Sequence, residues 1–402
     1  VKRDKFNDYP KFGVWPDAYY MTANLFTSSS FAGAGVWAFE RLQMLQGLPA
    51  RLVHFDLAGV NLSFGGMLPA DLDGPPPPAG APGYFAEVDD AAWIGPQDAL
   101  RLWEFHVDWA TPANSTFGQS GQPDLILPTA PWSPLPCVGV TRHCIPQPSV
   151  SGDARLDAIG DRLMYRLVYR NFGDHATLLA NHTVDAGNGR AGIRWYELRR
   201  TEGAWEIYQQ GTYAGDWAGS SAHRWMASMA MDNRGNLAIG YTASSPTVYP
   251  SVRYIGRRVE DPLNTLPRLE TSFVEGGGSQ TSDSSRWGDY SMMSVDPADD
   301  CTFWYTSEYY PTTASYDWHT RIGAFQFAGC TSPPRGALHG VITDINTAQP
   351  LSGALVSLSG YVTFSNADGH YQFAILPTGS YTVQVTTYGY TSGAASVVIS
   401  AD

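Results

Sequence analysis

Several side chains have the types needed to bind or hydrolyse a sugar. The arginines that could clamp a carboxylate are Arg166, Arg170, Arg224, Arg286 and Arg321. The acids and nucleophiles that could act beside them are Asp17, Asp289, Glu308, Tyr290 and Tyr309. Glycoside hydrolysis requires a proton donor together with a base or nucleophile, so these residue types fit that chemistry.

A non-catalytic interpretation of the same residues is nevertheless preferred. Arginine packs against tryptophan in many proteins without any chemistry, and the sequence has no clean Ser-x-Asp-x-Gly-x-Thr-Trp motif. The residues kept as catalytic candidates are Arg166, Arg224, Arg286, Asp289, Tyr290 and Glu308.

Patterns for metal binding are weaker. The histidines lack HExxH or His-x-His spacing, which disfavours a transition-metal site; they include His175, His182, His223 and His319. Acidic residues cluster in the expected turn that contains Asp296, Asp299 and Asp300. Such turns supply oxygen ligands to Ca²⁺ in extracellular proteins, although aspartate also favours turns by itself. A Ca²⁺ ion at this turn is therefore the one cofactor expected as a candidate.

Carbohydrate binding would need exposed aromatic side chains. The tryptophans in excess of what packing obviously requires are Trp103, Trp109, Trp132, Trp205, Trp217 and Trp318. Most of them are expected in the core, because aromatic side chains dominate core packing.

The cysteines indicate an oxidising, extracellular or cell-surface location. Their intervals close two modest loops, which predicts disulfides Cys137–Cys144 and Cys301–Cys330. A zinc site is the rival interpretation, but no CxxC pair is present. Sequons at Asn61, Asn114 and Asn181 allow glycosylation if the host performs it.

Composition excludes several classes of function. The chain has 402 residues and a formal net charge of −13, which disfavours binding to nucleic acid or anionic lipid. The sequence has no run of 18 apolar residues, so we expect no membrane span, and the first residues show no signal peptide. With 41 Gly, 28 Pro and 13% aromatic residues, the chain is too rich in turns for a helical protein.

A loose repeat predicts an all-β fold dominated by a β-propeller. Segments marked by Trp15, Tyr84, Met164, Trp225 and Trp287 recur at intervals that each hold about four short strands, as propeller blades do. A β-sandwich is the alternative. We expect a propeller domain at residues 1–329, a Pro-rich hinge at 330–336 and a small β domain at 337–402, with one short helix at 40–46.

The last segment resembles the carboxypeptidase regulatory-like domain, a transthyretin-like sandwich of seven strands. The similarity rests on the run from Leu338 through Pro350 and Gly353, on Asn366-Ala-Asp-Gly369, and on Leu376-Pro-Thr-Gly379 with Tyr381, Val383 and Val385 behind it. The resemblance implies a turn at Pro350–Gly353, a hairpin corner at Asp368–Gly369, and a module without catalytic residues.

The first part resembles a family of large secreted bacterial β-propeller proteins that are distantly sialidase-like and functionally uncharacterised. The matching segments are residues 7–20, 165–175 and 287–306. The resemblance implies about five visible blades in a ring that is incomplete. We expect an extracellular structural or adhesive protein that associates with itself or with another surface protein through strand complementation. The alternative is a glycan-binding protein or a sialidase-like glycosidase that uses the propeller axis.

Overall fold

The computed structural model describes residues 5–28, 30–91, 96–136, 143–150, 155–215, 221–282 and 284–401. Regular structure there is almost entirely β-strand, as predicted. The expected helix is α1 (Arg41–Leu45), and two short 3-10 turns are η1 (Leu57–Gly59) and η2 (Pro112–Asn114).

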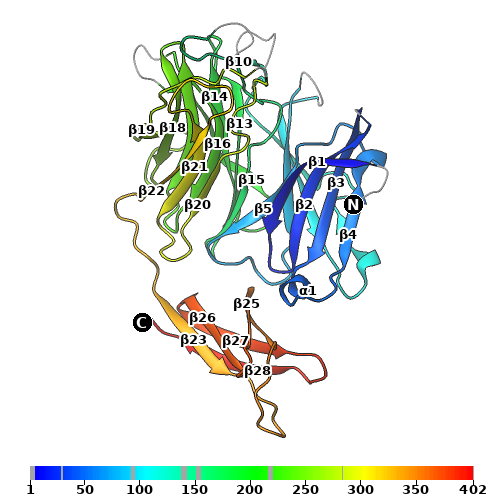
Figure 1. The fold of residues 1–402 in the computed structure, drawn as a ribbon. Helices are drawn as coiled ribbons and strands as arrows, with labels where there is room; N and C mark the ends of the chain where they lie inside the picture. The colour runs from blue at the N-terminus through cyan, green and yellow to red at the C-terminus, as the bar shows by residue number, and fades with distance from the viewer. Residues whose placement is uncertain are drawn as a thin grey trace.

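Five antiparallel strand meanders follow one another along the chain, and we number them as blades (Figure 1). Blade 1 contains β1 (Phe6–Val14), β2 (Ala18–Thr27), β3 (Ser30–Glu40) and β4 (Leu52–Asp56). Blade 2 contains β5 (Leu68–Asp73), β6 (Gly83–Asp89), β7 (Ala99–His106), β8 (Thr116–Phe117) and β9 (Leu125–Pro128). Both β8 and β9 pair with β7.

The remaining blades have the same meander order. Blade 3 contains β12 (Leu167–Asn171), β13 (Ala176–Asp185), β14 (Ala191–Arg200) and β15 (Glu206–Tyr213). Blade 4 contains β16 (His223–Met231), β17 (Leu237–Ser245), β18 (Val248–Arg257) and β19 (Thr271–Val274). Blade 5 contains three strands, β20 (Met292–Val295), β21 (Phe303–Tyr309) and β22 (His319–Phe325). A small ladder of β10 (His143–Ile145) and β11 (Leu156–Asp157) precedes blade 3.

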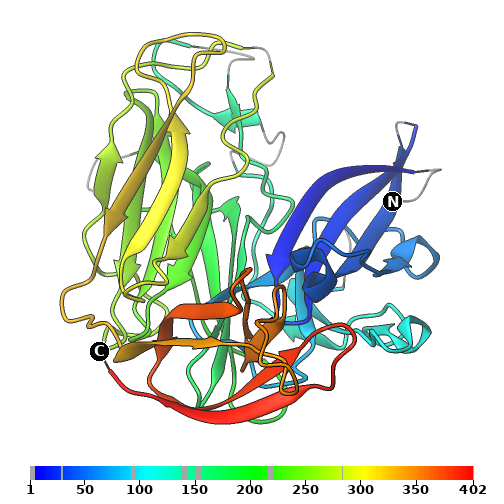
Figure 2. The same ribbon diagram turned by 60° about the horizontal axis from the view of Figure 1, so that its bottom comes forward.

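The first strands of successive blades lie side by side, which gives the radial arrangement of a β-propeller. The approach of β1 to β5 is close, since a Cβ on Gly13 would lie 2.2 Å from the carbonyl oxygen of Ala70. Strands β5 and β12 pair in parallel and fuse blades 2 and 3 into one sheet. Strand β16 packs on blade 3 and β20 packs on β16. Figure 2 shows blade 1 and blade 5 standing apart from each other. We call the side of the propeller between these two blades its open side.

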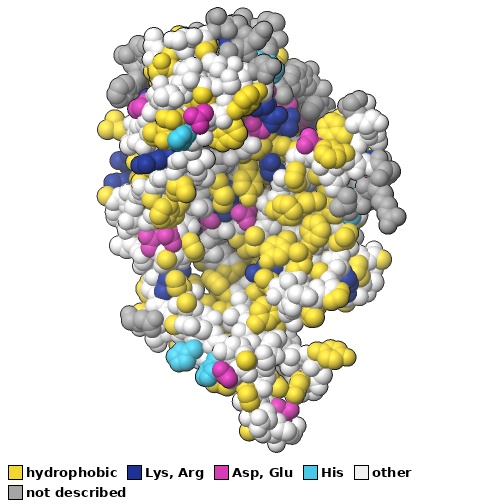
Figure 3. All heavy atoms as spheres, viewed as in Figure 1, with side chains coloured by type: hydrophobic (Ala, Val, Ile, Leu, Met, Phe, Trp, Pro, Cys, Tyr) yellow, Lys and Arg dark blue, Asp and Glu magenta, His cyan; other side chains and the backbone are white. Residues whose placement is uncertain are grey.

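The face of blade 1 that looks toward the open side is apolar. Phe12 pairs with Met21, which in turn pairs with Trp37, so these side chains share one face of the sheet. On β1, Phe12 and Val14 lie on this face and remain 49% and 42% exposed. Hydrophobic side chains accordingly gather over this sheet in the space-filling view (Figure 3).

Three of the five sequence markers lie outside strands, namely Met164, which precedes β12, and two tryptophans. Trp15 lies in the turn between β1 and β2, and Trp287 lies in the loop before β20. Both are buried, with exposed fractions of 1% and 0%. The recurrence of tryptophan therefore reflects aromatic packing between blades, while the strands begin a few residues later.

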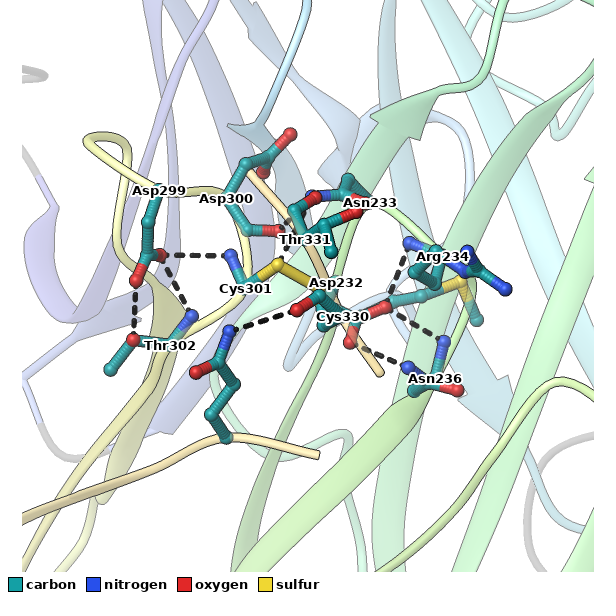
Figure 4. Close-up of a disulfide and its surroundings, with 12 residues drawn as sticks. Asp232, Asn233, Arg234, Asn236, Asp299, Asp300, Cys301, Thr302, Cys330 and Thr331 are labelled. Carbon is teal, nitrogen blue, oxygen red and sulfur yellow. Dashed lines mark hydrogen bonds between the residues drawn. A yellow bond between two sulfur atoms is a disulfide. The ribbon is translucent and has the colours of Figure 1, made fainter. Parts of the chain in front are cut away.

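A disulfide ties the end of the propeller to the turn that follows β20. Cys301 and Cys330 are bonded, with their Cα atoms 5.7 Å apart, as predicted (Figure 4). The side-chain amide of Asn233 donates to the carbonyl oxygens of Asp300 and Thr331, at 3.0 and 3.2 Å. The disulfide and these bonds hold the chain against blade 4 just before the hinge.

The hinge leads into a two-sheet sandwich. One sheet pairs β23 (Arg335–Val341) with β26 (His370–Pro377), and the other has the order β25 (Tyr361–Phe364), β24 (Leu355–Leu358), β27 (Gly379–Thr386), β28 (Gly393–Ile399). The described residues thus hold six strands where the resemblance implied seven. The core includes Val383 between Tyr381 and Val385, which share a face as expected.

One expected turn in this domain has a different role. Gly369 adopts a φ of +76°, which favours glycine, so Asp368–Gly369 is a turn as predicted. It is not a hairpin corner, because β25 and β26 belong to different sheets. It carries the chain from one layer of the sandwich to the other.

Candidate functional site

Arg166 is part of the axial core and not of a ligand site. Its side chain is 1% exposed and donates to Asp71 at 2.7 Å and to Asp73 at 2.8 and 3.1 Å. A further bond reaches the carbonyl oxygen of Met293 at 3.2 Å. This guanidinium therefore joins blades 2, 3 and 5 at the axis, which corrects its prediction as a catalytic candidate.

Two other candidate arginines, Arg224 and Arg170, are also bonded to groups of the protein. Arg224 is 1% exposed and donates from Nε to Glu270 at 2.6 Å, so it too is structural. Arg170 bonds Asp300 at 2.5 Å and the carbonyl oxygen of Met231. Arg166, Arg170 and Arg224 are thus each bonded to a carboxylate of the protein.

Three further candidates lie outside any shared site. Arg321 is exposed on β22. Asp17 lies between β1 and β2, where burial raises its pKa to about 6. Tyr309 packs against His319, with ring centres 5.9 Å apart.

Four of the predicted residues do come together, in a pocket at the end of blade 5 opposite the C-terminal domain. Its volume is about 450 Å³, and the candidates that line it are Arg286, Asp289, Tyr290 and Glu308. The loop before β20 supplies three of them and the end of β21 supplies Glu308. The other lining residues are Gln280, Ser282, Ser284, Trp287, Gly288, Tyr310, Tyr316 and Trp318. We call this the blade-5 pocket.

An ion pair forms one wall of the blade-5 pocket. Arg286 donates to Asp289 from Nε at 3.2 Å and from a second nitrogen, Nη2. The amide of Gln280 donates to the backbone oxygen of Arg286 at 2.8 Å, and the backbone N–H of Gln280 donates to Gln147. Because Gln147 and Gln280 are buried, they fix the position of this loop.

Glu308 supplies a carboxyl group that favours the protonated state. Burial raises its pKa to about 7, and the nearby Asp289 adds to the rise. The backbone N–H of Gly288 donates to this carboxyl group. Gly288 has a φ of +45° and a Cβ there would lie 3.2 Å from Glu308, so glycine suits this contact. At neutral pH Glu308 is therefore populated both as the acid, which can donate a proton, and as the carboxylate.

Tyr290 lies between the blade-5 pocket and a cationic cluster on the axis. Its ring meets Tyr9 edge to face at 5.4 Å, and the ammonium of Lys11 lies 4.3 Å from the ring centre. Burial raises the pKa of Tyr290 to about 12, so its hydroxyl remains protonated. Sequence reasoning missed Lys11 and Tyr9, since both lie far from this loop along the chain.

Two exposed aromatic side chains form the rim. Tyr316 is 67% exposed and Trp318 is 54% exposed, and both come from the loop between β21 and β22. Trp318 was among the predicted candidates, whereas Tyr316 was not. Of the other tryptophans considered, Trp103 and Trp205 are buried, and Trp217 lies outside the described residues.

The proposed calcium ligands are engaged by protein groups. Asp296 accepts from Trp304, Asp299 accepts from Thr302, and Asp300 accepts from Arg170. The described residues contain no group of three or more His, Cys, Asp or Glu side chains placed to hold a metal ion. Calcium binding at this turn stays a prediction.

The remaining sequence predictions concern covalent modification. Cys144 is disulfide-bonded, and Cys137 lies outside the described residues. Asn114 is exposed and Asn61 is partly exposed. Asn181 is 0% exposed within β13, so a glycan on this side chain is incompatible with this fold.

Comparisons with known proteins identify the C-terminal domain. Residues 337–402 match the carboxypeptidase regulatory-like domain family, as the sequence predicted. No curated protein sequence matches the chain. Over the described residues, no helix is long and apolar enough to cross a membrane.

Solved structures of low similarity are β-propeller glycosidases. A Trypanosoma rangeli sialidase in complex with sialic acid is 11% identical with a TM-score of 0.42, over 95% of this chain and 54% of the sialidase. The chain thus spans about half the length of that enzyme. A Penicillium chrysogenum α-L-arabinanase complexed with arabinobiose is 9% identical with a TM-score of 0.38, over 80% of this chain and 93% of the arabinanase. Likeness at this level assigns no activity, so function must be argued from the blade-5 pocket.

Proposed function

We propose that this protein acts outside the cell and binds carbohydrate in the blade-5 pocket. The observation that carries the proposal is the exposed pair Tyr316 and Trp318 at the rim of a polar pocket. Aromatic rings offer an apolar face to the C–H groups of a sugar, while a few polar groups fix its orientation. Glu308 and Arg286 supply donors and acceptors for sugar hydroxyls.

Replacing Trp318 with alanine is expected to weaken glycan binding by at least about tenfold, because burial of an aromatic ring against a ligand contributes on the order of 1–3 kcal/mol. The measurement is titration calorimetry with glycans selected on an array. Trp304→Ala is the matched control, since Trp304 is 42% exposed on β21 and does not line the pocket. Equal loss in both variants, or retention in Trp318→Ala, would count against the proposal.

A second candidate, hydrolysis of the bound glycan, is favoured by Glu308. Its carboxyl group, with a pKa raised to about 7, is partly protonated at neutral pH and lines a pocket that also contains the Asp289 carboxylate. A protonated acid paired with a carboxylate is the minimal set for cleaving a glycosidic bond. Binding alone does not require a proton donor, so substitution of Glu308 separates the two candidates.

An assembly role is favoured by the open side of the propeller. The apolar side chains of Phe12 and Val14 on β1 are exposed there, and contiguous exposed apolar surface is typical of interfaces. We expect the purified chain to associate as its concentration rises, and Phe12→Ser to reduce that association. Light scattering after size exclusion checks this, and a monomer at every concentration would refute self-association.

A further inference from the structure

We propose that the ligand of the blade-5 pocket is an uncharged glycan, and that acidic sugars are disfavoured there. This inference rests on the proposed function, because it names the class of carbohydrate that the same pocket takes. It follows from how the charges in and around the pocket are already paired.

The pocket lining has no excess of positive charge. Among the described residues that line it, Arg286 is the one cationic side chain, while Asp289 and Glu308 both carry carboxyl groups. The charges of Arg286 and Asp289 cancel. The formal charge of the lining is therefore zero when Glu308 is protonated and negative when Glu308 is ionised. The whole chain adds a net charge of −13, which repels anions at long range.

The charge of Arg286 is already paired with a carboxylate of the protein. A guanidinium binds a carboxylate best through two parallel N–H groups, and Arg286 already presents Nε and Nη2 to Asp289. Asp289 is only 14% exposed at its side chain, whereas that of Arg286 is 55% exposed. A carboxylate on the ligand could reach only the remaining Nη1–Nη2 edge, on a guanidinium whose charge the partly buried Asp289 already neutralises. Sugar hydroxyls can still accept from the remaining N–H groups.

The two cationic side chains behind the pocket, Lys11 and Arg162, already contact groups of the protein. The ammonium of Lys11 lies over the rings of Tyr9 and Tyr290, 3.8 and 4.3 Å from their centres. Arg162 donates two bonds to Asp161, at 2.9 and 2.8 Å. Burial also lowers the pKa of Lys11 to about 8, which weakens its charge above neutral pH. These groups do not supply a second anion-binding wall.

The other polar groups suit hydroxyls. The protonated carboxyl group of Glu308 can both donate and accept, as can the hydroxyls of Ser282 and Ser284. An ionised Glu308 or Asp289 would repel a sugar carboxylate held in the same pocket. The pocket therefore recognises a ligand through hydroxyl groups and a ring face rather than through a charge.

The test compares matched oligosaccharides that differ by one sialic acid or one uronic acid residue. We expect titration calorimetry at neutral pH to show binding of the neutral oligosaccharide in each pair. The acidic oligosaccharide should bind with an affinity at least about tenfold lower, because like charges repel. Tighter binding of the acidic members would overturn this inference and leave glycan binding intact. Binding of no member would overturn both the inference and the proposed function.

A substitution at Asp289 tests the same inference independently. Asp289→Asn removes one negative charge and releases Arg286, so acidic members should gain at least about tenfold in affinity relative to their neutral partners. Asp289→Glu, which keeps the charge, is the control and should preserve the wild-type preference. An unchanged preference in Asp289→Asn would show that charge pairing at Arg286 does not set the selectivity.

Discussion

Arg166→Ala is expected to destabilise the propeller by about 3–5 kcal/mol, because removing one partner of a buried ion pair leaves the other charge uncompensated. Asp73 is 7% exposed, and the side chain of Asp71 is 14% exposed. Arg166 supplies a donor to each of them and a third to Met293. One substitution thus removes contacts among three blades, and urea unfolding measures the loss.

Arg321→Ala is the matched control for this prediction. Arg321 is exposed on β22, and substitutions of such surface residues usually change stability by less than about 0.5 kcal/mol. If Arg166→Ala fails to accumulate as soluble protein while Arg321→Ala does, the result still shows that Arg166→Ala destabilises the protein more than Arg321→Ala. A free energy of unfolding for Arg166→Ala within about 0.5 kcal/mol of wild type would contradict the structural role.

Glu308→Gln is expected to abolish hydrolysis while retaining glycan binding. The amide keeps the size and hydrogen-bonding capacity of the protonated carboxyl group but cannot deliver a proton, and loss of a general acid typically costs about 10²–10⁴-fold in rate. Because burial raises the pKa of Glu308 to about 7, the acid form predominates below that pH. Wild-type hydrolysis should therefore fall as pH rises through about 7.

Release of reducing sugar across a pH series, with binding measured in parallel, checks this prediction. If Glu308→Gln retains binding within a few-fold and wild type hydrolyses no glycan that it binds, the protein is a binding protein and hydrolysis is excluded for those glycans. If Glu308→Gln hydrolyses as fast as wild type, Glu308 is not the proton donor.

Sequence alone was sufficient for the architecture. Alternating segments separated by Gly, Asn and Asp turns predicted blades, and the turn at residues 232–236 does join β16 to β17. The C-terminal domain was recognisable because its motif residues occupy turns and one face of β27. Strand starts near Trp15 and Trp287 were misplaced, because an aromatic side chain buried in a loop gives the same local signal as one that opens a strand.

The site was only partly predictable. Arg286, Asp289 and Tyr290 are close in sequence, so a shared location could be expected, and the addition of Glu308 depends on the register of β21 with β20. Arg166 and Arg224 were misassigned because their partners Asp73 and Glu270 are distant along the chain. Lys11 and Tyr316 were missed for the same reason, since tertiary structure alone places them near this loop.

A crystal structure of the protein with a neutral oligosaccharide selected by binding would test the central claim most directly. We predict a sugar ring stacked on Trp318 or Tyr316, with hydroxyl contacts to Glu308 and with the Arg286–Asp289 pair intact. A sugar bound at another surface, such as the pocket of about 410 Å³ beside Pro78 and Arg200, would contradict the assignment of the blade-5 pocket.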